Sequence, residues 1–238
     1  MIYQSRDLEG IKLVNWALKQ FQVKIKIQGR GNIPKDGKTI FTANHPLGGL
    51  DSLALLSVLG SYYNSLKILS NEILDVVPGL HSLRVSMATF GTFTRSNAVD
   101  LKNVLESDQP LCVFPAGFVA KRNPIKIKDL PWKKFFITNA IKHKRRIVPV
   151  FISGKNSSLF YNIASLRKLL LLNSNLEMFL LPHEMFNKAG SRITIIFGTP
   201  ISYKTFDRNQ THWEWAQDIR KLVFLMGENH KKTDLRIL

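Results

Sequence analysis

The chain has 238 residues, which fits one large domain because domains average about 150 residues. With 45% hydrophobic and 21% charged residues, its composition is that of an ordinary globular protein and excludes intrinsic disorder, a collagen-like chain and a coiled coil. The single cysteine, Cys112, excludes an intramolecular disulfide and any site built from several thiolates.

The chain is strongly basic. Its 34 Lys and Arg residues exceed its 17 Asp and Glu residues, for a formal net charge of +17. Such an excess favours an anionic partner, whether nucleic acid, an anionic membrane face or an acidic protein. No stretch approaches the roughly 18 consecutive apolar residues that cross a bilayer, and residues 1–7 lack a secretory pattern. We therefore expect a cytoplasmic protein without a membrane span.

The first predicted elements are a helix and two strands. Apolar residues at spacings of three and four predict a leading amphipathic helix within residues 1–21, periodic from Asp7 to Phe21. Period-two alternation predicts a strand over 23–27, and the turn residues of 29–38 precede a second strand over 39–43. We expect these two strands to form a hairpin or to be neighbours in the sheet.

Strands and helices then alternate along the chain. Further helices are predicted over 50–60, 71–77, 99–106, 132–143 and 209–227, and strands over 67–69, 85–92, 111–114, 147–152 and 192–197. This alternation favours an α/β sheet with helices on both faces and catalytic loops at the strand ends. Without repeats or linkers, residues 1–238 are expected to form one domain, with a loosely held basic tail over 228–238.

A histidine and an aspartate share the loop predicted between strand 39–43 and helix 50–60. The segment reads Asn44-His45-Pro46-Leu47-Gly48-Gly49-Leu50-Asp51. A carboxylate that reaches an imidazole fixes its tautomer and leaves the other ring nitrogen to take a proton from an alcohol. His45 and Asp51 are therefore candidate catalytic residues. Taken alone, they also fit a turn histidine and a helix N-cap aspartate.

Four segments in this order resemble the motifs of the lysophospholipid acyltransferase superfamily, typified by bacterial 1-acylglycerol-3-phosphate acyltransferase. They are Asn44-His45 with Asp51, Gly91-Thr92-Phe93-Thr94-Arg95, Phe114-Pro115-Ala116-Gly117 and Ile147-Val148-Pro149-Val150. The first and third look closest to the hemolysin-like bacterial subgroup, which is associated with O-acylation of lyso-aminolipids such as ornithine and glycine lipids. The resemblance implies a single α/β domain with a mixed, mostly parallel sheet flanked by helices.

The same resemblance implies an O-acyltransferase. It would move a fatty acyl group from acyl-CoA or acyl carrier protein to the hydroxyl of a lysolipid, either a lyso-aminolipid or lysophosphatidic acid. His45 would be the general base, Asp51 would orient it, and Arg95 would hold the acceptor's anionic head group, for which a planar guanidinium is suited. The other matched residues expected to bind substrate are Asn44, Gly91, Thr92, Phe114, Pro115 and Gly117.

The chain departs from the family pattern at two positions. Five residues separate His45 from Asp51, one more than in the family motif, so the loop must bulge to bring the side chains together. Ala116 stands where many members have Glu, so any carboxylate needed there must be supplied elsewhere or dispensed with. Lys121 and Arg122 follow and are candidate anion contacts, although a solvated basic loop explains them equally well.

Much of the positive charge lies in one segment. From Lys121 to Lys168 there are thirteen Lys and Arg residues and one acid, Asp129. Each basic residue near an anionic lipid surface is worth about 1 kcal/mol, so a few on one face would hold the protein to a membrane. The same face would suit an acidic acyl carrier protein, and a merely solvated surface is the alternative. We expect peripheral attachment to the inner face of the cell membrane.

Two other functions stay open. A basic nucleic-acid-binding protein fits the charge, although the sequence has no helix-turn-helix, zinc-finger or RNP signature, and no nucleic-acid partner is expected. A family member that has lost activity and only binds lipid fits the altered spacing and the missing Glu. No His or Cys spacing suits a metal ion, so we expect no metal and no cofactor other than the acyl donor as substrate. The sequence leaves the oligomeric state undetermined.

Overall fold

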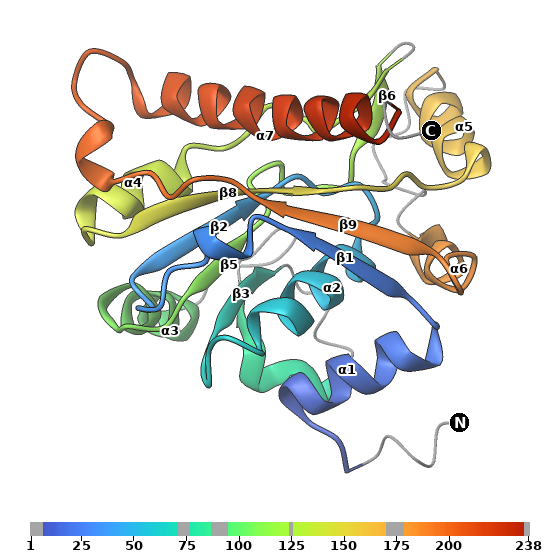
Figure 1. Cartoon of the computed structure of the whole chain (residues 1–238), viewed down its shortest axis with the longest axis horizontal. Helices are drawn as coiled ribbons and strands as arrows, with labels where there is room; N and C mark the ends of the chain where they lie inside the picture. Colours follow the sequence, from blue (N-terminus) through green and yellow to red (C-terminus); the bar gives the residue numbers. More distant parts are fainter. Residues whose placement is uncertain (1–6, 71–76, 87–94, 124–125, 170–178, 236–238) are drawn as a thin grey trace.

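A computed structural model describes residues 7–70, 77–86, 95–123, 126–169 and 179–235. At its centre is a seven-stranded sheet, and every neighbouring pair is parallel except β8 with β9 (Figure 1). The predicted mixed, mostly parallel sheet is confirmed. In spatial order the strands are β1 (Lys24–Gln28), β9 (Arg192–Phe197), β8 (Arg146–Ile152), β2 (Thr39–Ala43), β5 (Leu111–Val113), β3 (Lys67–Ser70) and β4 (Arg84–Ser86).

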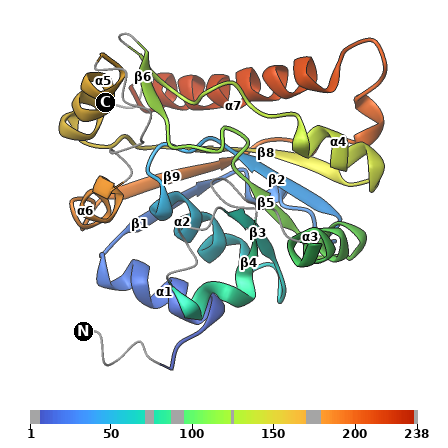
Figure 2. The ribbon, with the colours of Figure 1, turned by 180° about the vertical axis from the view of Figure 1, so that it is seen from behind.

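Helices cover both faces of the sheet (Figures 1 and 2). One face packs against α1 (Gly10–Gln20) and α2 (Gly49–Leu59), and the other against α3 (Arg95–Glu106), α4 (Phe135–Lys142) and α7 (His212–Leu235). The smaller elements are the antiparallel strands β6 (Lys121–Asn123) and β7 (Lys126–Lys128), the helices α5 (Ser158–Leu169) and α6 (Leu181–Phe186), and the 3-10 turns η2 (Arg30–Asn32), η4 (Pro78–Leu83) and η6 (Tyr203–Thr205).

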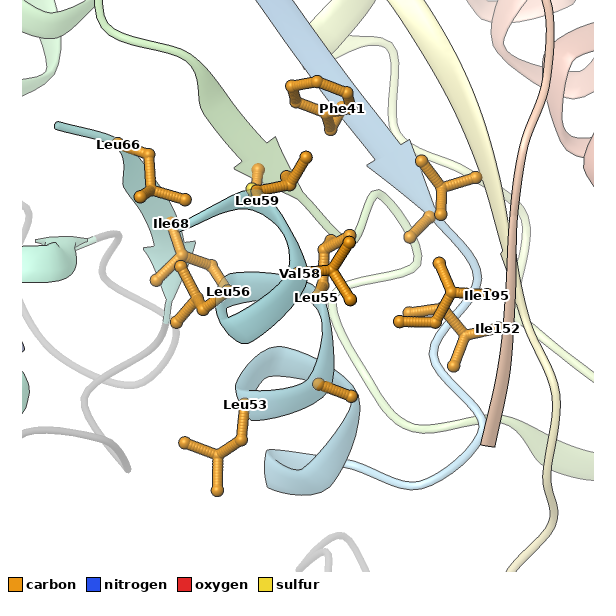
Figure 3. Close-up of a cluster of buried hydrophobic side chains, with 14 of the residues drawn as sticks. Phe41, Leu53, Leu55, Leu56, Val58, Leu59, Leu66, Ile68, Ile152 and Ile195 are labelled. Atoms are coloured by element: carbon orange, nitrogen blue, oxygen red, sulfur yellow. The ribbon is translucent and has the colours of Figure 1, made fainter. Parts of the chain in front are cut away.

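Helix α2 fills the centre of one core. It is apolar nearly all round, and nine of its eleven residues are buried. Figure 3 shows its leucines lying among apolar side chains that include Phe41 of β2, Ile68 of β3 and Ile195 of β9. A helix with no polar face is stable only when protein surrounds it, so α2 holds its N-terminus in a fixed place beside the end of β2.

Arg145, counted above with the basic surface, is instead a fully buried structural residue. Its guanidinium donates hydrogen bonds to the carbonyls of Val104 and Leu105 at the end of α3 and to that of Ser107 just beyond. It also donates to the carbonyls of Gly37, Thr39 and Gln109. Because the last carbonyls of a helix lack partners within the helix, Arg145 caps α3 and joins it to the neighbouring loops.

Some details of the sequence prediction are wrong. Strand β1 pairs with β9 rather than with β2, from which β9 and β8 separate it. The last helix continues to Leu235, so most of the supposedly loose tail is helical. The predicted helix 132–143 begins at Phe135, and the helix predicted from residue 99 begins at Arg95. Most of predicted helix 71–77 and the end of strand 85–92 lie outside the described residues.

Candidate active site

The candidate catalytic pair lies where β2 ends and α2 begins. His45 follows β2 by two residues, and Asp51 occupies the first turn of α2. The loop between them turns at Gly48, whose φ of 80° and ψ of −129° suit glycine, and a Cβ there would lie 3.1 Å from Leu181. The five-residue gap is therefore accommodated by a glycine turn that folds Asp51 back toward His45.

The two side chains are hydrogen bonded. His45 Nδ1 lies 3.0 Å from Asp51 Oδ2, which also accepts the main-chain N–H groups of Leu47 and Gly48 at 2.8 and 3.0 Å. Asp51 is 0% exposed, whereas the His45 side chain is 16% exposed. Burial raises the pKa of Asp51, and its hydrogen bonds to His45 and to the main chain oppose that rise. With Nδ1 bound to Asp51, Nε2 is the ring nitrogen left for proton transfer.

Phe114 of the third motif fixes the plane of the histidine ring. The two rings are stacked, with centroids 4.2 Å apart and planes 23° apart. Gly117, at a φ of 73°, closes a turn by donating its N–H to the carbonyl of Phe114 at 3.0 Å. Farther along, the Ala120 N–H donates to the His45 carbonyl at 2.8 Å. The first and third motifs thus form one site. Pro115 is buried beside it.

Asn44 joins the first motif to β8, the strand that carries the fourth motif. Its buried side-chain amide donates to the Ile152 carbonyl at 2.8 Å and accepts the Ile152 N–H at 2.7 Å. This reciprocal pair of hydrogen bonds ties the residue before His45 to the end of β8. Its predicted contact with substrate stays a prediction.

The residues predicted to contact an anion lie on two separate elements, α3 and β6. Arg95 is exposed at the first residue of α3, and Gly91 and Thr92 lie outside the described residues. Lys121 Nζ lies 5.5 Å from the centre of the Phe118 ring. Arg122 donates to Asn162 Oδ1 at 3.2 Å and lies over the Tyr161 ring at 5.6 Å. Arg122 thus has protein partners on α5, and a role for either residue toward substrate stays a prediction.

Sequence reasoning missed a second buried carboxylate at this site, Asp129. Its Oδ1 accepts the main-chain N–H of His45 at 3.2 Å, and its Oδ2 accepts Nε1–H of Trp132 at 3.0 Å. Burial raises the pKa of Asp129 to about 6, although its hydrogen bonds oppose that rise. The signal in the sequence was a lone acid within a basic segment, three residues before a tryptophan.

A further polar cluster that the sequence did not reveal lies at the start of α5. Glu184 of α6 is buried and accepts both the N–H and the hydroxyl of Ser157. Next to it, the N–H of Asn156 donates to the Tyr161 hydroxyl at 3.1 Å, while neither polar atom of the Asn156 side chain, which is buried, has a partner among the described residues. This cluster connects α5 to α6.

Other reactive groups do not form a site in the described part of the chain. Among the described residues, no three His, Cys, Asp or Glu side chains are grouped as metal ligands. The absence of a metal stays a prediction. Burial raises the pKa of the Cys112 thiol, which lies in the core strand β5 and is a packing residue. Among the same residues, no helix is long and apolar enough to cross a membrane.

Comparison with known proteins identifies the class. A family model described as "Acyltransferase" matches residues 4–231. A lyso-glycine lipid O-acyltransferase of Bacteroides thetaiotaomicron is 36% identical over 222 residues, 93% of this chain and 82% of the relative. A protein of the same name from Phocaeicola vulgatus is 35% identical over 221 residues, 92% of this chain and 79% of the relative.

A solved structure has the same fold. The 1-acyl-sn-glycerophosphate acyltransferase PlsC of Thermotoga maritima aligns with a TM-score of 0.53 over 92% of this chain and 83% of its own, at 18% identity. The chain belongs to the acyltransferase family, within the lysophospholipid acyltransferase superfamily. It is an O-acyltransferase, as the four sequence motifs predicted.

Proposed function

We propose that the protein transfers a fatty acyl group from a thioester, either acyl-CoA or acyl carrier protein, to the hydroxyl of a lysolipid. One observation carries the mechanism: His45 Nδ1 lies 3.0 Å from a carboxylate that is 0% exposed. This contact holds the imidazole in the tautomer whose Nε2 accepts a proton. A hydrogen-bonded pair of this kind argues against a family member that only binds lipid.

In the proposed reaction, His45 Nε2 takes the proton of the acceptor hydroxyl as its oxygen attacks the thioester carbonyl carbon. The C–S bond of the resulting tetrahedral species breaks, and the thiolate leaves. The imidazolium returns its proton to the sulfur, so the products are an ester and a thiol. Asp51 stabilises the imidazolium between these steps, and the stacked Phe114 ring keeps Nε2 in one plane.

The proposed acceptor is a lyso-aminolipid, and a lyso-glycine lipid is the first one to test. The relatives that support it are 36% and 35% identical over more than nine-tenths of this chain and carry that substrate in their names. Such an acceptor is anionic, as is lysophosphatidic acid. Arg95 is proposed to hold the anionic group, because a guanidinium binds a carboxylate or a phosphate through two parallel hydrogen bonds.

The test uses purified protein with labelled acyl-CoA or acyl carrier protein donors, against lyso-glycine lipid, lyso-ornithine lipid and lysophosphatidic acid. We expect His45→Ala to lower kcat by about 10²- to 10⁴-fold, the range of a positioned base. His183→Ala, at an exposed histidine of α6, is the matched control and keeps wild-type turnover. A folded His45→Ala variant with wild-type turnover would refute the mechanism, and product from lysophosphatidic acid alone would refute the acceptor.

We also propose that the enzyme works at an anionic membrane surface, on the inner face of the cell membrane. Lys133 and Lys134 before α4 are exposed, as are two aromatic residues, Phe179 just before α6 and Phe186 at its last position. Cations draw a protein to anionic lipid, and aromatic side chains enter its interface. Reversal of both lysines to Glu should weaken sedimentation with phosphatidylglycerol vesicles more than Lys12→Glu with Lys19→Glu on α1. Equal effects would refute this docking face.

A further inference from the structure

Asp129 reaches His45 from a distant part of the chain. It lies 84 residues after the histidine and accepts its main-chain N–H at 3.2 Å. The other carboxylate oxygen accepts the Trp132 indole N–H at 3.0 Å, and Asp129 is only 3% exposed. Both carboxylate oxygens are therefore occupied by neutral donors inside the protein.

The segment that carries Asp129 is fixed to the long helix α7. Arg220 donates to the Asp129 carbonyl at 2.5 Å. Gln217, one turn earlier, accepts the Trp132 N–H at 3.2 Å and donates to its carbonyl at 2.8 Å. A continuous set of hydrogen bonds thus runs from α7 through Asp129 to the main chain of His45.

This arrangement costs stability. A buried carboxylate whose oxygens meet only neutral donors pays a large desolvation penalty, which those hydrogen bonds offset only in part. Here burial raises the pKa of Asp129 to about 6. Its local contacts therefore compensate only partly for the burial of the charge, and residues that cost stability are concentrated at functional sites.

We propose that Asp129 is a positioning residue for acyl transfer, which holds the main chain of His45 so that Nε2 meets the acceptor hydroxyl at reacting distance. The proposal rests on the proposed role of His45. Asp51 and Phe114 set the orientation of the imidazole ring, whereas Asp129 and the Ala120 N–H set the position of the main chain that carries it. Ala116 leaves the third motif without a carboxylate, and Asp129 supplies one at this site.

The test compares Asp129→Asn with Glu184→Gln, a matched control. Both replace a buried carboxylate that accepts two neutral donors, but Glu184 binds Ser157 rather than His45. Misplacement of a reacting group by about 1 Å costs about 10²-fold in rate. We therefore expect Asp129→Asn to lower kcat by about 10- to 100-fold with both KM values within about threefold, and Glu184→Gln to keep kcat within about threefold of wild type.

A double variant separates positioning from folding. In Asp129→Asn the amide nitrogen must face either the His45 N–H or the indole N–H. Trp132→Phe removes the indole donor, so the amide oxygen becomes free to bind His45. We expect the double variant Asp129→Asn with Trp132→Phe to recover at least about threefold in kcat over Asp129→Asn alone, which a purely structural role does not predict.

Several results would overturn the proposal. They are wild-type kcat in Asp129→Asn, an equal loss of kcat in Glu184→Gln, and failure of both the single and the double variant to fold. His45→Ala is measured beside them. If that variant keeps its activity, the proposed base is wrong; if it is inactive while Asp129→Asn matches wild type, only the positioning role fails.

Discussion

Replacement of Asp51 by Asn tests the charge of the candidate pair separately from its geometry. Three donors converge on Oδ2: Nδ1 of His45 and the main-chain N–H groups of Leu47 and Gly48. The carbonyl oxygen of Asn is expected to take this place, because an amide nitrogen there would face three donors. The NH₂ group then replaces Oδ1, which has no partner in the described part of the chain. The hydrogen bonds persist and the negative charge is lost.

The size of the effect follows from Coulomb's law. With about 4 Å between the ring charge and the carboxylate, and an effective dielectric constant of about 20, the imidazolium loses about 4 kcal/mol of stabilisation. That free energy corresponds to about 10³-fold in kcat. Because burial raises the pKa of Asp51, removal of its charge should not lower the melting temperature.

The assay is kcat for transfer from labelled acyl-CoA to lyso-glycine lipid, measured for both proteins at the same pH. Thermal unfolding by circular dichroism accompanies it. Asp108→Asn is the control, since Asp108 is exposed and its contact, 3.7 Å from Lys38, lies at the surface. Folded Asp51→Asn protein with kcat within about tenfold of wild type would refute the reasoning.

Three further predictions follow from other parts of the structure. Arg145→Met should lower the free energy of unfolding by at least about 3 kcal/mol in urea, because the buried carbonyls lose their donor; wild-type stability would contradict this. Gly48→Ala should lower the free energy of unfolding by about 1–3 kcal/mol, because alanine is strained at a φ of 80°. It should also lower kcat, because the loop between His45 and Asp51 would move, and an unchanged kcat would contradict this. As pH rises from about 4 to 7, the free energy of unfolding of the wild type should fall by about 3 kcal/mol relative to that of Asp129→Asn, because burial raises the pKa of Asp129 from 3.8 to about 6 in the folded protein. A difference between the two proteins that does not change with pH would contradict this.

The sequence was informative wherever a property is local. Alternation of strands and helices predicted the α/β class, and the apolar run 50–60 predicted a buried helix, which is α2. His45 and Asp51 were found because a strand, a glycine turn and a helix are consecutive in the chain. Their hydrogen bond is set by residues only six apart.

The sequence failed where a property depends on distant residues. The strand over 23–27 was paired with its nearest neighbour in sequence, but its partner β9 begins at Arg192. The alternating pattern of a short strand does not indicate which other strand of the sheet it pairs with. Arg145 was counted with the basic surface and Asp129 was noted only as the single acid of that segment, whereas the structure shows both to be hydrogen bonded to distant main chain.

Local properties could be predicted and long-range contacts could not, for a physical reason. Hydrophobic period, turn residues and caps act over a few residues, so the amino-acid sequence alone predicted the main strands and helices and the fold class, and it placed His45 and Asp51 in one loop. Desolvation and hydrogen-bond partners depend on what surrounds a side chain after the chain has folded. Only the tertiary structure therefore decided that Asp129 holds the main chain of His45, and that Asn44 fixes the same loop to β8.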